Sequence, residues 1–289
     1  MSRQQGGTED CVPRTERPGY LSRLFAYRPA FYGILLVAVV TLMTLFAPLL
    51  TPYGRDTIDL DAILSPPSAS HVLGTDELGR DLFTRIMYGG RFSLMVAFTS
   101  IVLATGIGLL FGALAGYFGG LWENLVTGAD DLFMSVPVFL VLLFTAAFSE
   151  GRIWLIPLVI GSTMWMEAAR IVRARFLQLK CEEYVEAARS LGSSDLAIVF
   201  RHVLPQALPP VIVAATIGFA HAMLIESALS FLGFGIQPPV PTWGNMLQNA
   251  QAFLRTSPLV AAAPGFMIFA ICLCFNFIGD GLRRALADH

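Results

Sequence analysis

The stretch EAARSLG at residues 186–192, followed after nine residues by HVLP at residues 202–205, decides how this chain is organised. It lies within a polar segment, residues 171–206, between apolar stretches that can each cross a membrane. A long polar loop with helix-forming residues interrupted by a glycine and a proline is unusual in a membrane protein unless a component on the aqueous side binds it. We therefore predict that residues 171–206 form a structured, protein-binding loop.

The composition indicates a membrane protein before any single segment is considered. Of the 289 residues, 55% are hydrophobic and only 14% are charged, and the mean hydropathy is +0.65. A soluble domain usually carries about 25% charged residues. The net charge of −2 gives no reason to expect binding to nucleic acid. We therefore expect the lipid bilayer to be the main environment of the chain.

Six apolar segments predict an all-α, polytopic membrane protein. The first has twenty residues without a charge, enough to cross about 30 Å of hydrocarbon as a helix. The fourth is short and could extend to Arg170. Three glycines of the second segment, Gly106, Gly108 and Gly112, suit close contact between helices. The six segments are residues 31–50, 92–115, 132–148, 153–166, 211–232 and 260–278.

The placement of Lys and Arg predicts the orientation, because cytoplasmic loops carry an excess of these residues. With the N-terminus in the cytoplasm, thirteen of the 19 lie inside and six lie outside. This N-in, C-in arrangement puts residues 171–206 in the cytoplasm. It divides the chain into a cytoplasmic tail (1–30), a first transmembrane helix (31–50), an outer loop with a short interfacial helix at 81–88 (51–91), a core of five transmembrane helices that includes the cytoplasmic loop (92–282) and a cytoplasmic C-terminus (283–289).

The cytoplasmic loop is predicted to hold two short helices. The first covers residues 182–191, which are good helix formers, and Gly192 is a suitable residue to end it. Ser193 or Ser194 can cap the second helix, with Asp195 in its first turn, and Pro205 would close it. Ala187 and Ala188 would offer a flat surface for close approach. A plainer alternative is an amphipathic loop that lies on lipid headgroups.

The spacing of this loop resembles the EAA loop of bacterial ABC importer permeases. Glu-Ala-Ala, three residues, Gly192, nine residues and a close in Leu204-Pro205 match the pattern of that family. His202 stands where the general pattern has isoleucine, and the peptide-importing branch commonly has histidine there. The resemblance implies that the loop docks into ATPase subunits. The residues it assigns to this docking are Glu186, Ala187, Ala188, Gly192, Asp195, Leu204 and Pro205.

Four further motifs, in the same order along residues 65–286, resemble the "C" permease of the dipeptide, oligopeptide and nickel branch. Each motif alone is a weak signal, but together they are specific. Gly233, Gly235 and the Pro238-Pro239 pair are expected to fold the chain back at the outer surface. The motifs are GTDELGRD at 74–81, Asp131 six residues before Pro137, SFLGFGIQPP at 230–239 with Trp243-Gly244, and Asn276 with GDGLR at 279–283.

The resemblance implies a fold, a cargo and partners. The fold would be the transmembrane domain of a type I ABC importer in the bacterial cytoplasmic (inner) membrane. The partners would be a homologous second permease, two cytoplasmic ATPases and an extracytoplasmic solute-binding protein. The cargo would be dipeptides or oligopeptides, with nickel chelates or glutathione-like compounds as alternatives.

A P-loop is absent from the sequence. Its lysine must be preceded by glycine and followed by serine or threonine, but Lys180, the single lysine, stands between Leu179 and Cys181. We therefore expect neither catalysis nor a cofactor in this chain. ATP and its magnesium ion would be bound by the partner ATPases.

Glu226 is the candidate for contact with the cargo, together with Ser227 and Ser230. It falls inside the fifth apolar segment, where a charged side chain costs roughly 2.5–3.5 kcal/mol on insertion scales. Glu226 could meet the amino terminus of a passing peptide, pair with the second permease or lie near the outer headgroups. His221 is about 140° away around the helix, so the two do not form an obvious metal pair, and we expect no metal site.

Two other classes of function compete with an importer subunit. An ion-gradient-driven secondary transporter could use Glu226, His221 and Asp280 as a proton relay, but these residues are scattered and no inverted repeat is evident. An intramembrane enzyme is not supported, because the sequence contains neither HExxH nor GxSxG.

Overall fold

The fold is known from a computed structural model that describes residues 24–148 and 152–287. Residues 1–23 of the predicted tail, residues 149–151 between the third and fourth predicted spans, and residues 288–289 lie outside this description. The described parts contain helices and one isolated β-bridge, so the all-α prediction is confirmed. The helices are α2 (Arg28–Leu45), α3 (Ala47–Leu50), η1 (Leu60–Ala62), α4 (Leu82–Phe118), α5 (Gly120–Ser135), α6 (Val138–Ala147), α7 (Leu155–Leu179), α8 (Glu183–Ser190), α9 (Asp195–Ile198), the π-helical η2 (Val199–Val203), α10 (Leu204–Phe231), α11 (Trp243–Ala250), η3 (Gln251–Phe253) and α12 (Leu259–Ala287).

Five helical stretches of the described chain are long and apolar enough to cross a membrane. They are α2, α4, α7, the continuous run from α9 to α10, and α12. A sixth span results if α5 and α6, which are bent by 82° at the break between them, are counted together. The expected number of spans is reached only with this bent pair, and the straight third span predicted over residues 132–148 is wrong. The sequence did not predict α5 because Glu123 and Asp130 interrupt its apolar pattern, whereas both pair with arginines of α7.

The outer loop leads directly into a transmembrane helix. Residues 81–88, which we expected to form a separate interfacial helix, are the N-cap and the first two turns of α4. Leu82, Ile86 and Met87 are buried in the bundle rather than laid on lipid. Arg85 does not interrupt the helix, because it is buried and its Nε lies 3.2 Å from Asp76 Oδ2.

The two central helices, α4 and α7, run parallel and pack together along a glycine seam. A Cβ atom on Gly108 would lie 2.5 Å from Ala168 Cβ, and one on Gly112 would lie 2.6 Å from the Ala169 carbonyl oxygen. Gly116 continues the seam against Phe176. Such small residues let helix backbones approach closely inside a membrane. The predicted contact role is confirmed for Gly108 and Gly112. It is wrong for Gly106, where a Cβ atom would meet no described neighbour within 4 Å.

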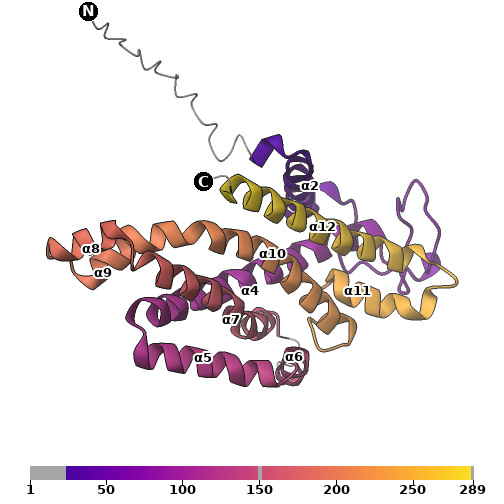
Figure 1. The fold of residues 1–289 in the computed structure, drawn as a ribbon. Helices are drawn as coiled ribbons and strands as arrows, with labels where there is room; N and C mark the ends of the chain where they lie inside the picture. Colours follow the sequence, from indigo (N-terminus) through magenta and orange to yellow (C-terminus); the bar gives the residue numbers. More distant parts are fainter. Residues whose placement is uncertain (1–23, 149–151, 288–289) are drawn as a thin grey trace, which may run out of the picture.

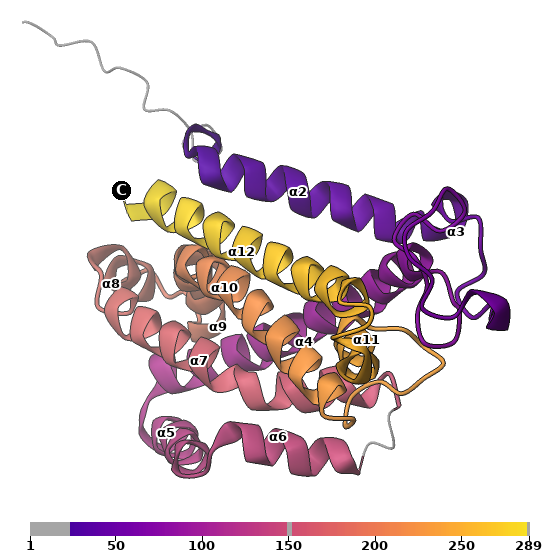
Figure 2. The ribbon, with the colours of Figure 1, turned by 90° about the vertical axis from the view of Figure 1, so that its right-hand side faces the viewer.

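The remaining helices surround this pair. α10 packs against α4, α7 and α12, and α2 lies antiparallel on α12, with the Arg284 guanidinium 4.4 Å from the centre of the Tyr27 ring. Figures 1 and 2 both place α8 and α9 at one end of the bundle and the 51–81 loop with α11 at the other. The start of α2 and the end of α12 lie toward the α8–α9 end.

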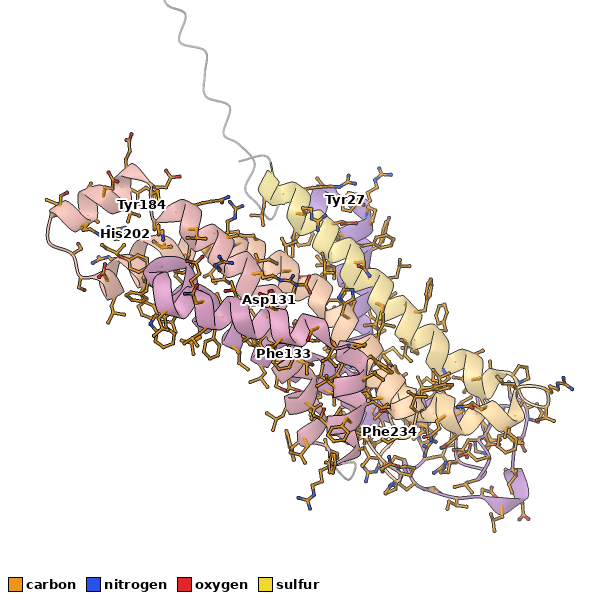
Figure 3. The ribbon with its side chains drawn as sticks, turned by 60° about the horizontal axis from the view of Figure 1, so that its bottom comes forward. Tyr27, Asp131, Phe133, Tyr184, His202 and Phe234 are labelled. Atoms are coloured by element: carbon orange, nitrogen blue, oxygen red, sulfur yellow. The ribbon has the colours of Figure 1, made fainter. Side chains whose placement is uncertain are left out.

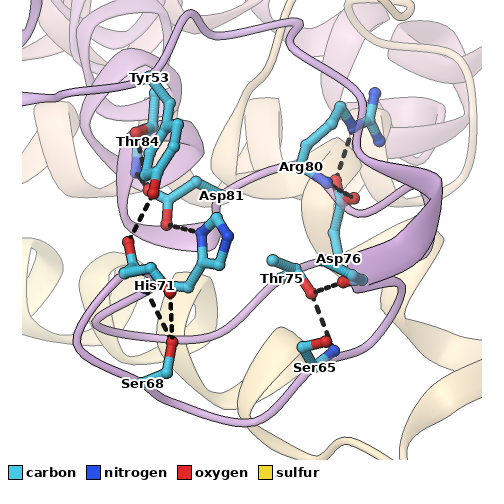
Figure 4. A network of polar contacts seen from close by, with 11 residues as sticks. Tyr53, Ser65, Ser68, His71, Thr75, Asp76, Arg80, Asp81 and Thr84 are labelled. Atoms are coloured by element: carbon cyan, nitrogen blue, oxygen red, sulfur yellow. Dashed lines mark hydrogen bonds and ion pairs between the residues drawn. The ribbon is translucent and has the colours of Figure 1, made fainter.

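The outer loop is held by a compact polar network (Figure 4). Asp76 accepts from the Arg80 Nε at 2.7 Å and from the backbone N–H groups of Leu78 and Arg80. Asp81 caps α4 by accepting from both the N–H and the hydroxyl of Thr84, and it also contacts His71 Nδ1 at 3.0 Å. The GTDELGRD motif therefore builds the loop and starts α4.

We predict that Gly112→Leu destabilises the bundle, because the new side chain would collide with the backbone of α7. Overpacking of this kind typically costs about 1–3 kcal/mol. The matched control is Gly106→Leu, on the same helix but facing open space. The melting temperature of the purified protein in detergent should fall for Gly112→Leu and stay near wild type for the control. Equal melting temperatures for the two variants would contradict the seam.

Candidate functional site

The polar segment between α7 and α10 folds into a projecting unit, which we call the helical knob and define as residues 183–205. α8 ends where Gly192 adopts φ +84°, a left-handed conformation that suits glycine. Ser194 caps α9 by accepting from the Ala197 N–H, so of the two predicted caps it is Ser194 that is used. The sequence therefore folds the knob through the turn and cap that its pattern predicts.

The second helix of the knob does not end at Pro205. Leu204 and Pro205 are instead in the first turn of α10, and a π-helical turn at Val199–Val203 joins α9 to α10. A proline inside an α-helix clashes with the carbonyl four residues earlier. The widened turn comes directly before Pro205, so it accommodates the ring and lets the helical path continue. As a result, the knob and the fifth span form one continuous helical element from Asp195 to Phe231.

The knob has an apolar interior and apolar side chains on its outside. Ala188 faces inward and is buried with Val185, so the two alanines do not form a shared outer surface as expected. Ala187 and Glu186 are exposed. Three large apolar side chains are also exposed: Leu191 (87%), Leu196 (63%) and Phe200 (66%). Apolar exposure of this kind on a projecting polar loop is typical of a protein-binding surface.

Polar contacts fasten the knob to the end of α4. Tyr117 donates a hydrogen bond to Asp195 at 2.7 Å, and Arg189 donates one to the Tyr117 hydroxyl at 3.2 Å. This hydroxyl raises the pKa of the Arg189 guanidinium further above its usual value, so the arginine stays charged. Lys180 donates to the carbonyl of Gly116 at 3.1 Å, in the last turn of α4. The sequence did not reveal Tyr117, because it lies 72 residues from Arg189.

His202 lies inside the knob beside another aromatic side chain. The centres of the Tyr184 and His202 rings are 6.5 Å apart, and both side chains are visible in the knob in Figure 3. His202 is half-buried, and it lies in the π-helical turn. Burial raises the pKa of the Tyr184 phenol. The histidine that marks the peptide-importing resemblance is therefore a packing residue at the junction of α9 and α10.

Glu226, Ser227 and Ser230 are enclosed by the subunit itself. Glu226 is completely buried and accepts hydrogen bonds from Ser93 at 3.2 Å and Ser230 at 2.8 Å. The Ser93 hydroxyl also accepts from the backbone N–H of Trp243, at the start of α11. This network joins α4, α10 and α11. In this conformation the three predicted pathway residues do not face a surface, and their role in transport stays a prediction.

The residues of the alternative proton relay are not assembled. His221 and Asp280 are exposed, whereas Glu226 is buried. Within residues 24–148 and 152–287, no hydrogen bond links Glu226 to His221 or Asp280. The ion-gradient alternative therefore gains no support from the arrangement of these three side chains.

Sequence reasoning missed one carboxylate inside the apolar bundle. Glu167 lies at the middle of α7 and is exposed. The fourth span was predicted over residues 153–166 with a possible extension to Arg170, and Glu167 falls within that extension but was not considered as a site residue. Its neighbour Arg170 lies 3.5 Å from Asp130 of α5. The signal that could have revealed Glu167 was the apolar-to-polar change at that boundary.

Comparison with known proteins identifies the family. Residues 108–288 match the family model of the binding-protein-dependent transport system inner membrane component, and residues 20–67 match the N-terminal transmembrane domain of oligopeptide transport permease C. The fold resembles a chain of the MetNI methionine ABC transporter in an inward-facing conformation, with a TM-score of 0.56 and 21% identity over 71% of this chain and 97% of that chain. This likeness confirms the type I ABC importer fold.

Curated relatives match over most of their length. A putative peptide permease protein of Brucella suis is 41% identical, and the match covers 91% of this chain and 88% of the relative. The dipeptide transport system permease protein DppC of Alkalihalophilus pseudofirmus is 38% identical (89% and 84%), and the oligopeptide transport system permease protein OppC of Haemophilus influenzae is 36% identical (91% and 86%). The chain therefore belongs to the family of binding-protein-dependent transport system inner membrane components, the multi-pass permeases of ABC transporters.

Proposed function

We propose that this chain is one of two homologous permeases in an importer of dipeptides or oligopeptides, located in the bacterial cytoplasmic membrane. The names of the relatives in three genera support peptides as the cargo, and the match to the oligopeptide permease C domain supports the "C" position in a heterodimer. Nickel chelates and glutathione-like compounds are the alternative cargoes for the same machine.

The helical knob is the observation that carries this proposal. It exposes Leu191, Leu196 and Phe200 on a base that is packed from within and tied to α4 by Tyr117. A flexible loop could not transmit a displacement, whereas this unit is fixed to three helices of the bundle. Two of these connections are covalent, since α7 leads into α8 through residues 180–182 and α9 continues into α10.

We infer the following cycle from this geometry. This sequence contains no P-loop, so ATP must be bound and hydrolysed by other subunits, which would be two cytoplasmic ATPases. Their closure pushes the knob, and α7 and α10 tilt with it, so access to the pathway changes from one side of the membrane to the other. A solute-binding protein docks at the opposite end, on the 51–81 loop and α11. The network of Asp76, Arg80 and Asp81 makes that loop a firm docking platform.

We predict that a photo-reactive amino acid at Leu191 captures an ATPase subunit in intact cells. Leu191 is exposed at the turn of the knob, whereas Ala188 is too buried to reach a partner. Leu60, a residue of the same size exposed on the outer loop, is the matched control. Mass spectrometry of the cross-linked product should identify the ATPase only from the Leu191 probe. Failure to capture it, or equal capture from both positions, would overturn the docking role of the knob.

We further predict that Tyr117→Phe weakens coupling without preventing assembly. The variant loses the hydroxyl that joins Arg189 to Asp195, and a hydrogen bond is worth about 1 kcal/mol, or roughly a fivefold change in an equilibrium. Peptide uptake per ATP hydrolysed, measured in proteoliposomes, should therefore fall severalfold.

The control for this experiment is Tyr88→Phe, on the same helix. Within the described residues Tyr88 makes no side-chain hydrogen bond, so its hydroxyl can be removed without breaking a contact. Co-purification of the ATPases should be the same for both variants and the wild type. A Tyr117→Phe importer with unchanged coupling would show that the contact with α4 transmits nothing.

A further inference from the structure

Glu167 is a carboxylate on α7, a helix long and apolar enough to cross a membrane. It stands three residues before Arg170, to which the fourth apolar segment could extend, so it lies toward the cytoplasmic end of that predicted span. Its side chain is exposed, and no hydrogen bond or ion pair joins it to another residue of the described chain. Ionisable groups within membrane spans usually face a water-filled cavity or a partner rather than lipid.

The charges that surround Glu167 are already compensated. Arg170 lies 3.5 Å from Asp130, and Arg173 is paired with Glu123. Both arginines of this part of α7 are therefore directed toward carboxylates of α5. Glu167 is left as a negative charge with no positive group of the described chain paired with it.

The surface around Glu167 carries small side chains together with Ile101 and Met164. It borders a shallow recess of about 20 Å³ between α4, α7 and α10, to which Thr105, Ala214 and Ala215 also contribute. The recess itself holds little more than a water molecule. The Glu167 side chain is exposed beside it, so an extended peptide backbone could pass within hydrogen-bonding distance.

We propose that Glu167 binds the positively charged amino terminus of a peptide as it passes through the importer. This inference rests on the proposed function. A free peptide carries an α-ammonium group whatever its sequence, since the pKa of that group is about 7.7–8.0. A carboxylate–ammonium hydrogen bond is among the stronger polar contacts. Glu167 would thus recognise the one cation that all peptides share.

The position of Glu167 also links peptide binding to the movement that the ATPases impose on the helical knob. α7 leads through residues 180–182 into α8, so a push on the knob moves the helix that carries the carboxylate. Glu167 would meet the peptide in one arrangement and withdraw from it in the other. A carboxylate fixed to a static helix could not release its ligand in this way.

The test uses the assembled importer, with its second permease and ATPases, in lipid nanodiscs. Ala215→Cys places a reporter in the recess while Glu167 is retained, and the other cysteines outside the apolar segments, Cys11 and Cys181, are replaced by serine. A membrane-impermeant thiol reagent should modify the reporter, and the dipeptide Ala-Ala should slow the modification. N-acetylated Ala-Ala, which lacks the ammonium group, should not. Leu158→Cys, exposed on the opposite side of α7, is the control that should stay unmodified.

Two substitutions then assign the protection to the carboxylate. With Glu167→Gln, half-protection should need on the order of tenfold more Ala-Ala, because a hydrogen bond to a charged group is lost. Glu167→Asp should restore most of the protection. An unmodified reporter would place the recess against lipid or the second permease, and unchanged protection in Glu167→Gln would show that another group holds the peptide. Either result overturns the inference.

Uptake by proteoliposomes that also contain the binding protein separates this inference from the proposed function. If the wild-type importer moves no peptide, the proposed function fails, whatever the role of Glu167. If the wild type moves Ala-Ala and Glu167→Gln moves it with the same half-saturating concentration, only the inference about Glu167 fails. We expect Glu167→Gln to raise that concentration and Asp280→Asn, which alters an exposed carboxylate on α12, to leave it unchanged.

Discussion

The close contact between α4 and α7 is the constraint on which the other features depend. Gly108, Gly112 and Gly116 bring the two backbones together over the inner half of α4. This contact places the end of α4 beside the base of the knob, where Tyr117 and Lys180 can fasten it. It also turns Arg170 and Arg173 toward α5, where they pair with two of the three carboxylates of that helix, Asp130 and Glu123. A side chain at Gly112 would disturb all of these together.

Local chemistry made much of this predictable from the sequence. In lipid every backbone group must be paired internally, so long apolar runs could only be helices. Gly192 ends α8 and Ser194 caps α9 through contacts with residues no more than one helical turn away. The sequence therefore predicted α8, its end and the N-cap of α9. The chain reversal at Gly233 was predictable for the same reason, because its φ of +85° suits glycine.

The features that were missed depend on partners far away in the sequence. The separate interfacial helix was predicted without the knowledge that Asp76 compensates the charge of Arg85 inside the protein. For Glu226 the sequence showed the cost of a charge in an apolar segment but not Ser93, which lies 133 residues earlier and donates a hydrogen bond to it; its role in the pathway stays a prediction. Glu167 shows the reverse case, since its significance comes from the absence of a compensating group in the described chain. Hydropathy alone cannot distinguish a carboxylate that is hydrogen-bonded inside the subunit from one that has no partner in the described chain.

The continuous helix from Asp195 to Phe231 mechanically connects the outer end of the bundle with the helical knob at the other end. Its 37 residues extend over about 55 Å, and its far end is bonded to α11 through Glu226, Ser93 and Trp243. In the proposed importer, any docking event that favours one tilt of this helix must change the affinity of the ATPases for nucleotide, and nucleotide must change docking by the same factor. There, the arrival of a loaded solute-binding protein would alter nucleotide binding by the ATPases before the cargo is released.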